Sequence, residues 1–330
     1  MKIAVLGCLL AVSALSMAQE KGQSPIPPKA WIDPTKVEDE DFAIQGEYAG
    51  EYEGKKLGLQ IWAKGDGKFE AVGYHGGLPG TGWDEDTDTV VRIQGEWNEN
   101  KKTVFFESEH IRATVDGKVA QVMNEKQERV FQLGRKHRNS PTLGAKPPQG
   151  ATVLFDGKEQ NHFPNSKVTE DGLLEQGATS SDKFGDCTLH VEFMLSYMPT
   201  ARGQGRSNSG VYLQGRYEVQ VLDSFALEGK SNECGGIYSI HEPRINMCFP
   251  PLTWQTYDID FTAAKYDADG KKTANATITV KHNGVLVHEH ADIPETTRAA
   301  PVKEENSPGP LYLQNHGNPV RYRNIWLVKR

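Results

Sequence analysis

The sequence predicts an all-β protein in which a small antiparallel β domain precedes a larger two-sheet sandwich or jelly roll. Runs of about four to seven residues that alternate apolar and polar side chains recur along the chain, and most end at Gly, Asn or Asp. The first of the two regions shows no 3.6-residue apolar period, so we expect no helices there. The 33 glycines and 18 prolines likewise favour a fold with many turns.

The start of the chain predicts a signal peptide over residues 1–18. Lys2 supplies a positive charge, residues 3–15 form an apolar run, and the segment Ser16–Ala18 offers small residues at a cleavage point. The run is too short to span a bilayer stably, and Cys8 stands too early in it for a lipoprotein signal. We therefore expect cleavage near Ala18 and export to the periplasm or the extracellular space.

Composition divides the rest of the chain into two domains and a linker. Residues 19–41 form a charged, Pro-rich lead-in, and strand-like runs fill residues 42–134, a small β domain whose role the sequence does not indicate. The basic, Pro- and Gly-rich segment 135–150 predicts a linker. Residues 151–330 contain many strand candidates at regular spacing and one Asn-Gly hairpin signal at Asn283, which together predict the sandwich.

Charge and cysteine content limit the possible partners. A formal net charge of −7 makes nucleic acid or an anionic membrane a poor partner. Three cysteines remain after the signal peptide, an odd number. Cys234 and Cys248 could close a disulfide in an oxidising compartment, or both could stay reduced, with Cys187 a buried free thiol in either case. No Cys-x-x-Cys or Cys/His spacing indicates structural zinc.

The stretch "RYEVQVLD" carries the strongest candidate for a binding surface. Side chains alternate along a strand, so Tyr217, Val219 and Val221 are expected to face the core. Glu218 and Gln220 then share the opposite face, about 7 Å apart. This face is either solvated or the floor of a sugar site. Polar residues around the same predicted hairpin favour the second interpretation: Asn208 before it, Arg216 at its turn and Asp223 at its end.

A short internal similarity points to further candidates. The stretches VYLQGRYEV (residues 211–219) and LYLQNHGNPVRYRNI (residues 311–325) share Tyr-Leu-Gln, a Gly-containing step and then Arg-Tyr. The similarity places Tyr212 and Gln214 in a setting like that of Tyr312 and Gln314, and His316 follows at the end of the second strand. An isolated histidine is more often structural than catalytic, but the amide side chains around His316 favour a functional role.

Six separated motifs of the second domain resemble those of the 3-keto-disaccharide hydrolase domain family, formerly domain of unknown function 1080. In order they are LFDGK, NSGVYLQGRYEVQVLDSF, CGGIYSIHEPR, PPLTWQTYDIDF, HNGVLVH and GPLYLQNHGNPVRYRNIWLVK. The resemblance covers about residues 151–330. It implies a concanavalin A-like lectin/glucanase jelly roll that acts on 3-keto-glycosides. One departure is Phe163, since the opening motif of the family usually continues into a tryptophan.

The number of carboxylates on the candidate face predicts unusual chemistry. A retaining glycosidase needs two carboxylates about 5.5 Å apart, and an inverting one needs them about 6.5–9.5 Å apart. Glu218 is followed on its own face by Gln220 and Leu222, and Asp223 has the opposite parity. A single acid would suffice for a 3-keto sugar, because the ketone acidifies the hydrogen at C2 and a base can then expel the oxygen at C1.

This hypothesis assigns a role to each candidate residue. Glu218 would be the base or acid, His316 its partner, and Arg321 or Tyr238 would donate to the developing enolate. The substrate-binding candidates are Asn208, Tyr212, Gln214, Arg216, Gln220, Asp223, Tyr238, Arg321 and Arg323. The alternatives are a carbohydrate-binding, lectin-like module without chemistry and an interaction protein of the cell envelope.

No cofactor or metal is predicted. His288 and His290 share a face of a predicted strand, but no third ligand is evident and a solvated strand end is favoured. The acidic run from Asp84 to Asp88 could hold calcium, yet it lacks the Gly and Glu of an EF-hand loop and an ordinary acidic turn is favoured. The expected partner is an oligosaccharide or glycoside substrate.

Overall fold

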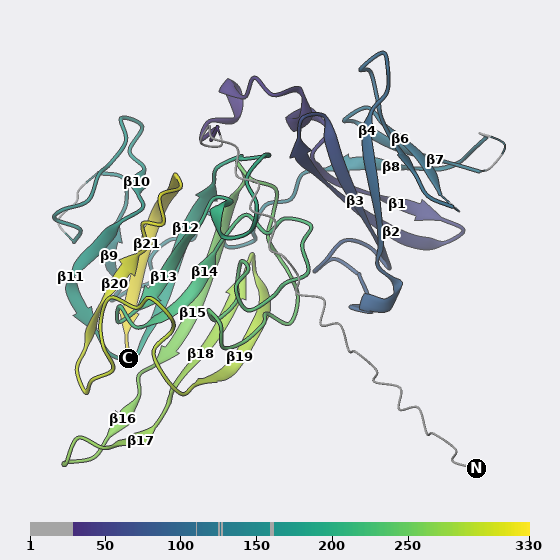
Figure 1. The fold of residues 1–330 in the computed structure, drawn as a ribbon. Coiled ribbons are helices and arrows are strands. Elements are labelled where there is room, and N and C mark those ends of the chain that lie inside the picture. Colours follow the sequence, from purple (N-terminus) through teal and green to yellow (C-terminus); the bar gives the residue numbers. More distant parts are fainter. Residues whose placement is uncertain (1–28, 110, 125, 127, 159–161) are drawn as a thin grey trace, which may run out of the picture.

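The computed structural model describes residues 29–109, 111–124, 126, 128–158 and 162–330. It consists of a closed β-barrel, at the upper right of Figure 1, and a two-sheet sandwich at the left. The predicted all-β fold class is confirmed, and short 3₁₀ helices occur at Pro34–Lys36, Glu40–Ala43, Thr87–Thr89 and Gly203–Gly205. The predicted signal peptide lies outside the described residues.

The barrel is built from eight antiparallel strands that pair in chain order. They are β1 (Gly46–Tyr52), β2 (Lys55–Gly65), β3 (Lys68–His75), β4 (Val91–Trp97), β5 (Val104–Glu107), β6 (Arg112–Val115), β7 (Val119–Met123) and β8 (Arg129–Lys136). Pairing of β1 with β8, at Tyr48 opposite Arg135, closes the barrel. Closure removes the exposed edges that an open sheet of these strands would leave. The small antiparallel β domain that the sequence predicts for this region is therefore a closed barrel.

The second domain is a sandwich of two antiparallel sheets. The larger sheet has the order β10-β21-β12-β15-β18-β19 with β9 beside β21, and the smaller has the order β11-β20-β13-β14. Their bounds are β9 (Thr152–Phe155), β10 (Leu174–Glu175), β11 (Ala178–Phe184), β12 (Cys187–Leu195), β13 (Ser209–Leu213), β14 (Tyr217–Val221), β15 (Trp254–Thr262), β18 (Ala276–His282), β19 (Val285–Ile293), β20 (Gly309–Leu313) and β21 (Val320–Lys329). A ribbon of β16 (Lys265–Tyr266) and β17 (Lys272–Ala274) extends from them. The Asn283-Gly284 turn joins β18 to β19 with positive φ at both residues, as the sequence predicts.

The sandwich core forms where alternate side chains of both sheets meet. Val219 of β14 and Leu313 of β20 are fully buried there, as are Phe193 of β12 and Tyr322 of β21. The Tyr322 hydroxyl lies 2.6 Å from the Ser209 hydroxyl across the two sheets. This packing fixes which side chains of β14 and β21 must point outward, and the candidate site depends on that parity.

Apolar side chains of the barrel also pack against the sandwich. Trp62, Val72 and Tyr74 leave the barrel on its outer face and are buried in the sandwich core cluster. The Arg206 guanidinium of the sandwich lies over the Trp62 ring, 4.5 Å from its centroid. In the other direction, Tyr197 of the sandwich is buried in the core cluster of the barrel. The two β domains therefore share buried apolar surface.

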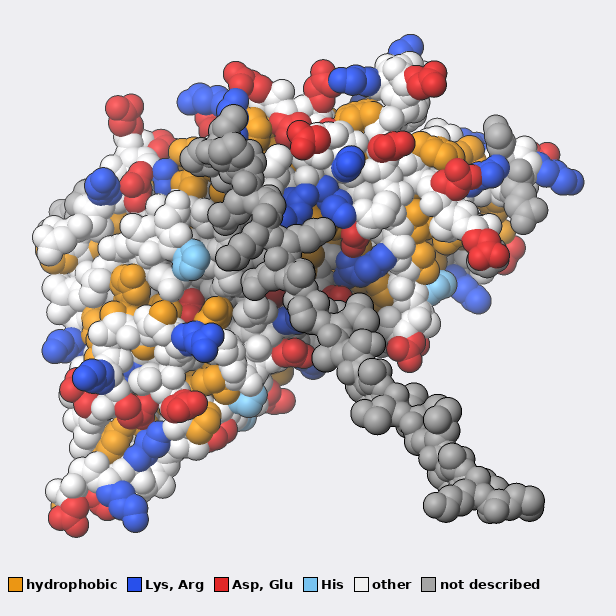
Figure 2. Space-filling view, in the orientation of Figure 1, with side chains coloured by type: hydrophobic (Ala, Val, Ile, Leu, Met, Phe, Trp, Pro, Cys, Tyr) orange, Lys and Arg blue, Asp and Glu red, His pale blue; other side chains and the backbone are white. Residues whose placement is uncertain are grey.

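The surface and the cysteines bear on two further expectations. Acidic and basic side chains are interspersed over the face shown in Figure 2. Among the described residues, no helix has the length and hydrophobicity needed to span a bilayer. The candidate Cys234–Cys248 disulfide is absent from the structure, where both are buried free thiols, as is Cys187. The Cys234 thiol lies 3.2 Å from the Tyr257 hydroxyl and is also a hydrogen-bond neighbour of the Cys248 thiol.

Candidate functional site

The candidate site lies on the outer face of the smaller sheet. Tyr217 and Val219 point into the core, so Glu218 of β14 points outward, directly opposite Tyr212 of β13. Tyr212 in turn pairs with Tyr312 of β20, and the two rings lie 5.4 Å apart. Glu218 is nevertheless 2% exposed. The face that the sequence left as either solvated or functional is therefore covered.

Two chain segments cover the Glu218 strand. The Tyr238 amide donates to the Glu218 carbonyl at 3.2 Å, and Ile237 forms a β-bridge with Val219. The Glu218 amide donates to the Thr297 hydroxyl at 3.0 Å. These main-chain bonds hold β14 between a neighbouring strand and two loops, so the position of the Glu218 backbone is fixed before any ligand binds.

The Glu218 carboxyl has a close and specific surrounding. The Tyr212 hydroxyl donates to Oε2 at 2.6 Å. Oε1 lies over Gly210, where a Cβ atom would come within 2.1 Å of it. Gly210 is therefore required by space rather than by backbone conformation, since any side chain there would displace the carboxyl.

Burial gives this carboxyl an unusual charge state. It raises the pKa of Glu218 to about 8, although the Tyr212 hydrogen bond acts in the opposite direction. Burial also raises the pKa of Tyr212, and the neighbouring Glu218 carboxyl adds to that effect. A glutamate with a pKa near neutrality can both accept and donate a proton, which is the requirement for general acid–base catalysis.

Phenol and amide groups surround the Glu218–Tyr212 pair. Gln314 Nε2 donates to the Tyr212 hydroxyl at 3.2 Å, while Gln314 Oε1 is buried and has no hydrogen-bond partner among the described residues. Tyr238 and Tyr312 both contribute electrostatically to the raised pKa of Tyr212, which places their phenols near it. The similarity between the Tyr212 and Tyr312 stretches thus has a structural counterpart, because both strands present a tyrosine to the same face.

An amide network extends the site beyond Gln220. Gln220 Nε2 donates to Gln204 Oε1 at 3.0 Å, and Asn208 Nδ2 donates to the same oxygen at 3.1 Å. Asn208 Oδ1 is buried and finds no hydrogen-bond partner in the part of the chain that the structure describes. Sequence reasoning missed Gln204, which stands in a Gly-Gln-Gly turn with no strand pattern to draw attention to it. Its role as the shared acceptor emerges only from the fold.

His316 lies in the loop after β20. Its side chain is exposed and makes no hydrogen bond within the described part of the chain. The Asn318 side chain of the same loop accepts a hydrogen bond from the main-chain N–H of Asn208 at 3.0 Å, so the loop adjoins the amide network. The structure therefore places His316 beside the site without a contact to Glu218.

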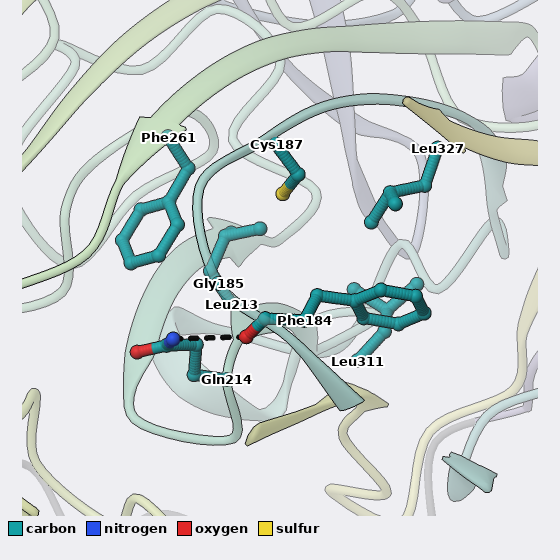
Figure 3. A pocket seen from close by; sticks show the side chains of 8 residues that line it. All are labelled: Phe184, Gly185, Cys187, Leu213, Gln214, Phe261, Leu311 and Leu327. Carbon is teal, nitrogen blue, oxygen red and sulfur yellow. Dashed lines mark hydrogen bonds between the residues drawn. The ribbon is translucent and has the colours of Figure 1, made fainter. Parts of the chain in front are cut away.

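Three predicted substrate contacts are structural instead. Asp223 forms a buried ion pair with Arg206 at 2.9 Å, because the chain bends inward at the end of β14. Gln214 donates to the Phe184 carbonyl at 2.9 Å beside a void of about 10 Å³ between the sheets (Figure 3). Arg216 is 1% exposed.

The Arg216 guanidinium holds the loop that precedes β20. It donates to the carbonyls of Lys303 and Ser307, at 2.7 and 2.8 Å, and pairs with Glu305. These partners use its charge and most of its donors. The prediction that Arg216 contacts substrate is corrected accordingly: it fixes a loop beside the sheet.

Arg321 and Arg323 belong to the other sheet. Tyr322 between them points into the core, so both arginines point to the outer face of the larger sheet. Arg321 pairs with Glu175 at 3.3 Å, and Arg323 pairs with Glu192 at 2.7 Å. The expected donation from Arg321 to a substrate enolate at Glu218 is therefore corrected by the parity of β21.

The two candidate metal positions have other roles. His288 is buried and hydrogen-bonded to the Gly235 carbonyl at 2.7 Å, and burial lowers its pKa to about 4. His290 is exposed. In the acidic run, Asp86 Oδ1 accepts the Asp88 amide at the start of a 3₁₀ helix. Within the described ranges, no three His, Cys, Asp or Glu side chains are grouped as a metal ion would require.

The chain is similar to solved bacterial structures over a little more than half of its length. A Parabacteroides distasonis ATCC 8503 protein described as a "putative glycosyl hydrolase" shares 33% identity over 56% of this chain and 85% of that chain, with a TM-score of 0.50. Another protein of the same description and organism shares 18% identity over 55% of this chain and 94% of that chain, with a TM-score of 0.39. No curated protein matches the chain.

The sequence match to a family covers the whole sandwich. Residues 150–328, more than half of the chain, match the model of the 3-keto-alpha-glucoside-1,2-lyase-like domain. This span includes the Glu218 face and the strands of the two sheets, except for Lys329 at the end of β21. The resemblance inferred from six motifs is confirmed, and the chain belongs to the family of 3-keto-alpha-glucoside-1,2-lyase-like domains.

Proposed function

We propose that this chain cleaves 3-keto-glycosides by removing the C2 proton with Glu218, in an elimination that hydration completes as net hydrolysis. The observation that carries the proposal is the buried Glu218 carboxyl, with a pKa raised to about 8 and a phenol bonded to it. Membership of a family described as 1,2-lyase-like, and similarity to a protein described as a glycosyl hydrolase, support action on a glycosidic bond.

The groups around Glu218 favour this reaction over ordinary glycoside hydrolysis. Ordinary hydrolysis uses two carboxylates that flank the scissile bond. The outer face of the smaller sheet presents Tyr212, Gln220, Tyr312 and Gln314 beside Glu218. The nearest acid along the chain, Asp223, is consumed by its ion pair with Arg206. One carboxyl with hydrogen-bond donors around it fits proton abstraction next to a ketone.

The proposed reaction needs no oxidant or reductant. The C2–H bond breaks, its proton moves to the Glu218 carboxylate, and its electrons form an enolate on the C3 carbonyl. The enolate expels the C1 oxygen with the bonding pair, a C1=C2 double bond forms, and the leaving oxygen takes the proton that Glu218 holds, which returns Glu218 to its carboxylate. Water then adds its hydroxyl at C1 and a proton at C2, which gives the free 3-keto sugar.

The neighbouring side chains have defined parts in this scheme. Tyr212 holds the Glu218 carboxyl through its hydroxyl and takes the partner role that the sequence assigned to His316. Tyr238 is the candidate donor to the enolate oxygen. Asn208 and Gln314 each keep an unpaired buried oxygen that can accept from sugar hydroxyls. His316 would contact substrate from the exposed loop.

The test is incubation of the full chain with 3-keto-trehalose in D₂O. We expect release of glucose and one deuterium at C2 of the released 3-keto sugar, in excess of a sample without protein. Unoxidised trehalose should stay intact. Release without deuterium would replace elimination by direct hydrolysis. Binding of the substrate without release would favour the lectin-like alternative and overturn the proposal.

We further propose that the chain is exported, because Lys2 and the apolar run of residues 3–15 resemble a signal peptide. The expected result is that protein recovered from a bacterial periplasm begins near Gln19. A mature chain that begins at Met1 and stays in the cytoplasm would overturn this proposal.

A further inference from the structure

The barrel has the geometry of a container for one small molecule. Its eight strands close in chain order, and a barrel of this size has an interior that either fills with side chains or holds one small ligand. At one end the lumen is filled, because Tyr48, Ile61, Phe69 and Val104 are buried there with at most 1% exposure. The other end decides which of the two cases applies.

At the other end a cavity of about 400 Å³ remains open. Its wall is formed by apolar side chains and two glycines, with Tyr74, His75 and Asn124 as the exceptions. Small residues at positions 71, 73 and 113 create this room, where larger side chains would close the lumen. The volume lies within the range of small-molecule sites, about 300–1,000 Å³.

Two observations show that the space is available and apolar up to its mouth. A Cβ atom added at Gly73 would meet no atom closer than 3.9 Å, with Val91 as its neighbour. Val91 and Val130, both on the wall, are 37% and 40% exposed and are among the four large hydrophobic side chains exposed in the described residues. Filling the cavity with an apolar ligand would remove this surface from water.

We propose that the barrel binds one apolar small molecule, with a hydrocarbon chain or aromatic ring inside and any polar end near exposed His75 at the mouth. The filled end of the barrel forms the floor, and residues of the seven strands from β2 to β8 form the wall. The site is separate from the Glu218 face and uses none of its residues.

The test measures binding of 8-anilinonaphthalene-1-sulfonate to the full-length protein by fluorescence. We expect saturable binding at one site per chain. The Gly73→Leu variant should bind at least about tenfold more weakly, a loss of about 1.4 kcal/mol, because the added side chain occupies the cavity. Gly134→Leu is the matched control, since it makes the same change on the outside of the barrel, where a Cβ meets nothing within 4 Å.

Competition identifies the ligand class. Displacement by dodecanoate indicates an acyl chain, and displacement by 1-naphthol indicates an aromatic ring; either supports the site. Equal probe binding by the wild type and Gly73→Leu would overturn the proposal, as would absence of binding. Circular dichroism should show that both variants are folded. Cleavage of 3-keto-trehalose should be unchanged in Gly73→Leu, so the two proposals fail independently.

Discussion

The two sheets of the sandwich each bury one glutamate on their outer face. At pH 7 one of these carboxyl groups is mainly protonated and the other is ionised. Glu218 on the smaller sheet is 2% exposed, and its pKa is raised to about 8. Glu192 on the larger sheet is 0% exposed, and its pKa is lowered to about 2. Similar burial thus accompanies two different chemistries.

The partners of each carboxyl explain the difference. Burial opposes the charge of both, but the His190 ring beside Glu192 lowers its pKa most, and Glu192 also accepts hydrogen bonds from the Asn324 amide at 2.8 Å, the Arg323 guanidinium at 2.7 Å and the Gly144 amide at 2.5 Å. Among the residues that the structure describes, one donor reaches the Glu218 carboxyl, the neutral phenol of Tyr212. Donors rather than depth therefore decide whether a buried carboxyl stays ionised.

The two sites also differ in what covers them. The linker lies over the Glu192 face, where the Thr142 hydroxyl bonds to Asp258 and the Gly144 amide bonds to Glu192. His190 completes this cluster, 2.6 Å from Asp258. A fully paired cluster that ties a linker to a sheet indicates a structural role, whereas an underpaired carboxyl beside unpaired amide oxygens indicates a reactive one.

The largest expected effect follows from Glu218→Gln. The amide keeps the shape of the side chain but cannot take the C2 proton, so turnover of 3-keto-trehalose should fall by roughly 10²–10⁴-fold. The melting temperature should not decrease, because the neutral amide resembles the protonated acid in a buried site. Near-normal turnover in a folded variant would remove Glu218 from the mechanism.

Glu192→Gln should produce the converse result. It leaves Arg323 without its buried anion and His190 with Asp258 alone, which should cost roughly 3 kcal/mol of unfolding free energy. Turnover per folded molecule should stay within about twofold, since the cluster lies on the opposite sheet. Denaturant titration together with activity at 20 °C separates the two readouts; a stable but inactive variant would contradict the assignment of a structural role.

The pH dependence of stability should separate the same two residues. The folded-state pKa of Glu218 lies above its ordinary value of 4.5. Its contribution to the unfolding free energy is therefore complete below pH 4.5 and is lost as pH rises through about 8. The folded-state pKa of Glu192 lies below 4.5. Its contribution to the unfolding free energy is therefore complete above pH 4.5 and is lost as pH falls through about 2.

The measurement is the unfolding free energy of wild type and Glu218→Gln at pH 5, 6.5 and 8. Relative to the variant, the wild type should lose stability as pH rises, with a slope of up to about 1.4 kcal/mol per pH unit. A constant difference across this range would show that the Glu218 carboxyl is ionised throughout.

The sequence predicted the elements of this site better than their spatial relations. The alternation in β14 correctly separated Glu218 from the core residues Tyr217 and Val219. The same alternation in β21 puts Arg321 and the core-facing Tyr322 on different faces of their sheet. Which of the two sheets a strand joins depends on long-range pairing, which no local sequence pattern contains. The Glu192 cluster escaped for the same reason, because its partners come from the linker, β12, β15 and β21.

The finest test of the comparison is Tyr212→Phe. The substitution removes the one hydrogen bond that stabilises the Glu218 carboxylate, so the pKa of Glu218 should rise further and the acid limb of the pH–rate profile should move to higher pH. The maximal rate should fall by about tenfold, the equivalent of one hydrogen bond to a charged group of roughly 1.5 kcal/mol.

Tyr312→Phe is the matched control, because the Tyr312 hydroxyl accepts a bond from the Asn315 amide and makes none to Glu218. The acid limb of the pH–rate profile of Tyr312→Phe should lie at the same pH as that of the wild type. If Tyr212→Phe also left the acid limb in place, the titrating group would not be the carboxyl that Tyr212 holds, and Glu218 would resemble Glu192 in being a buried structural acid.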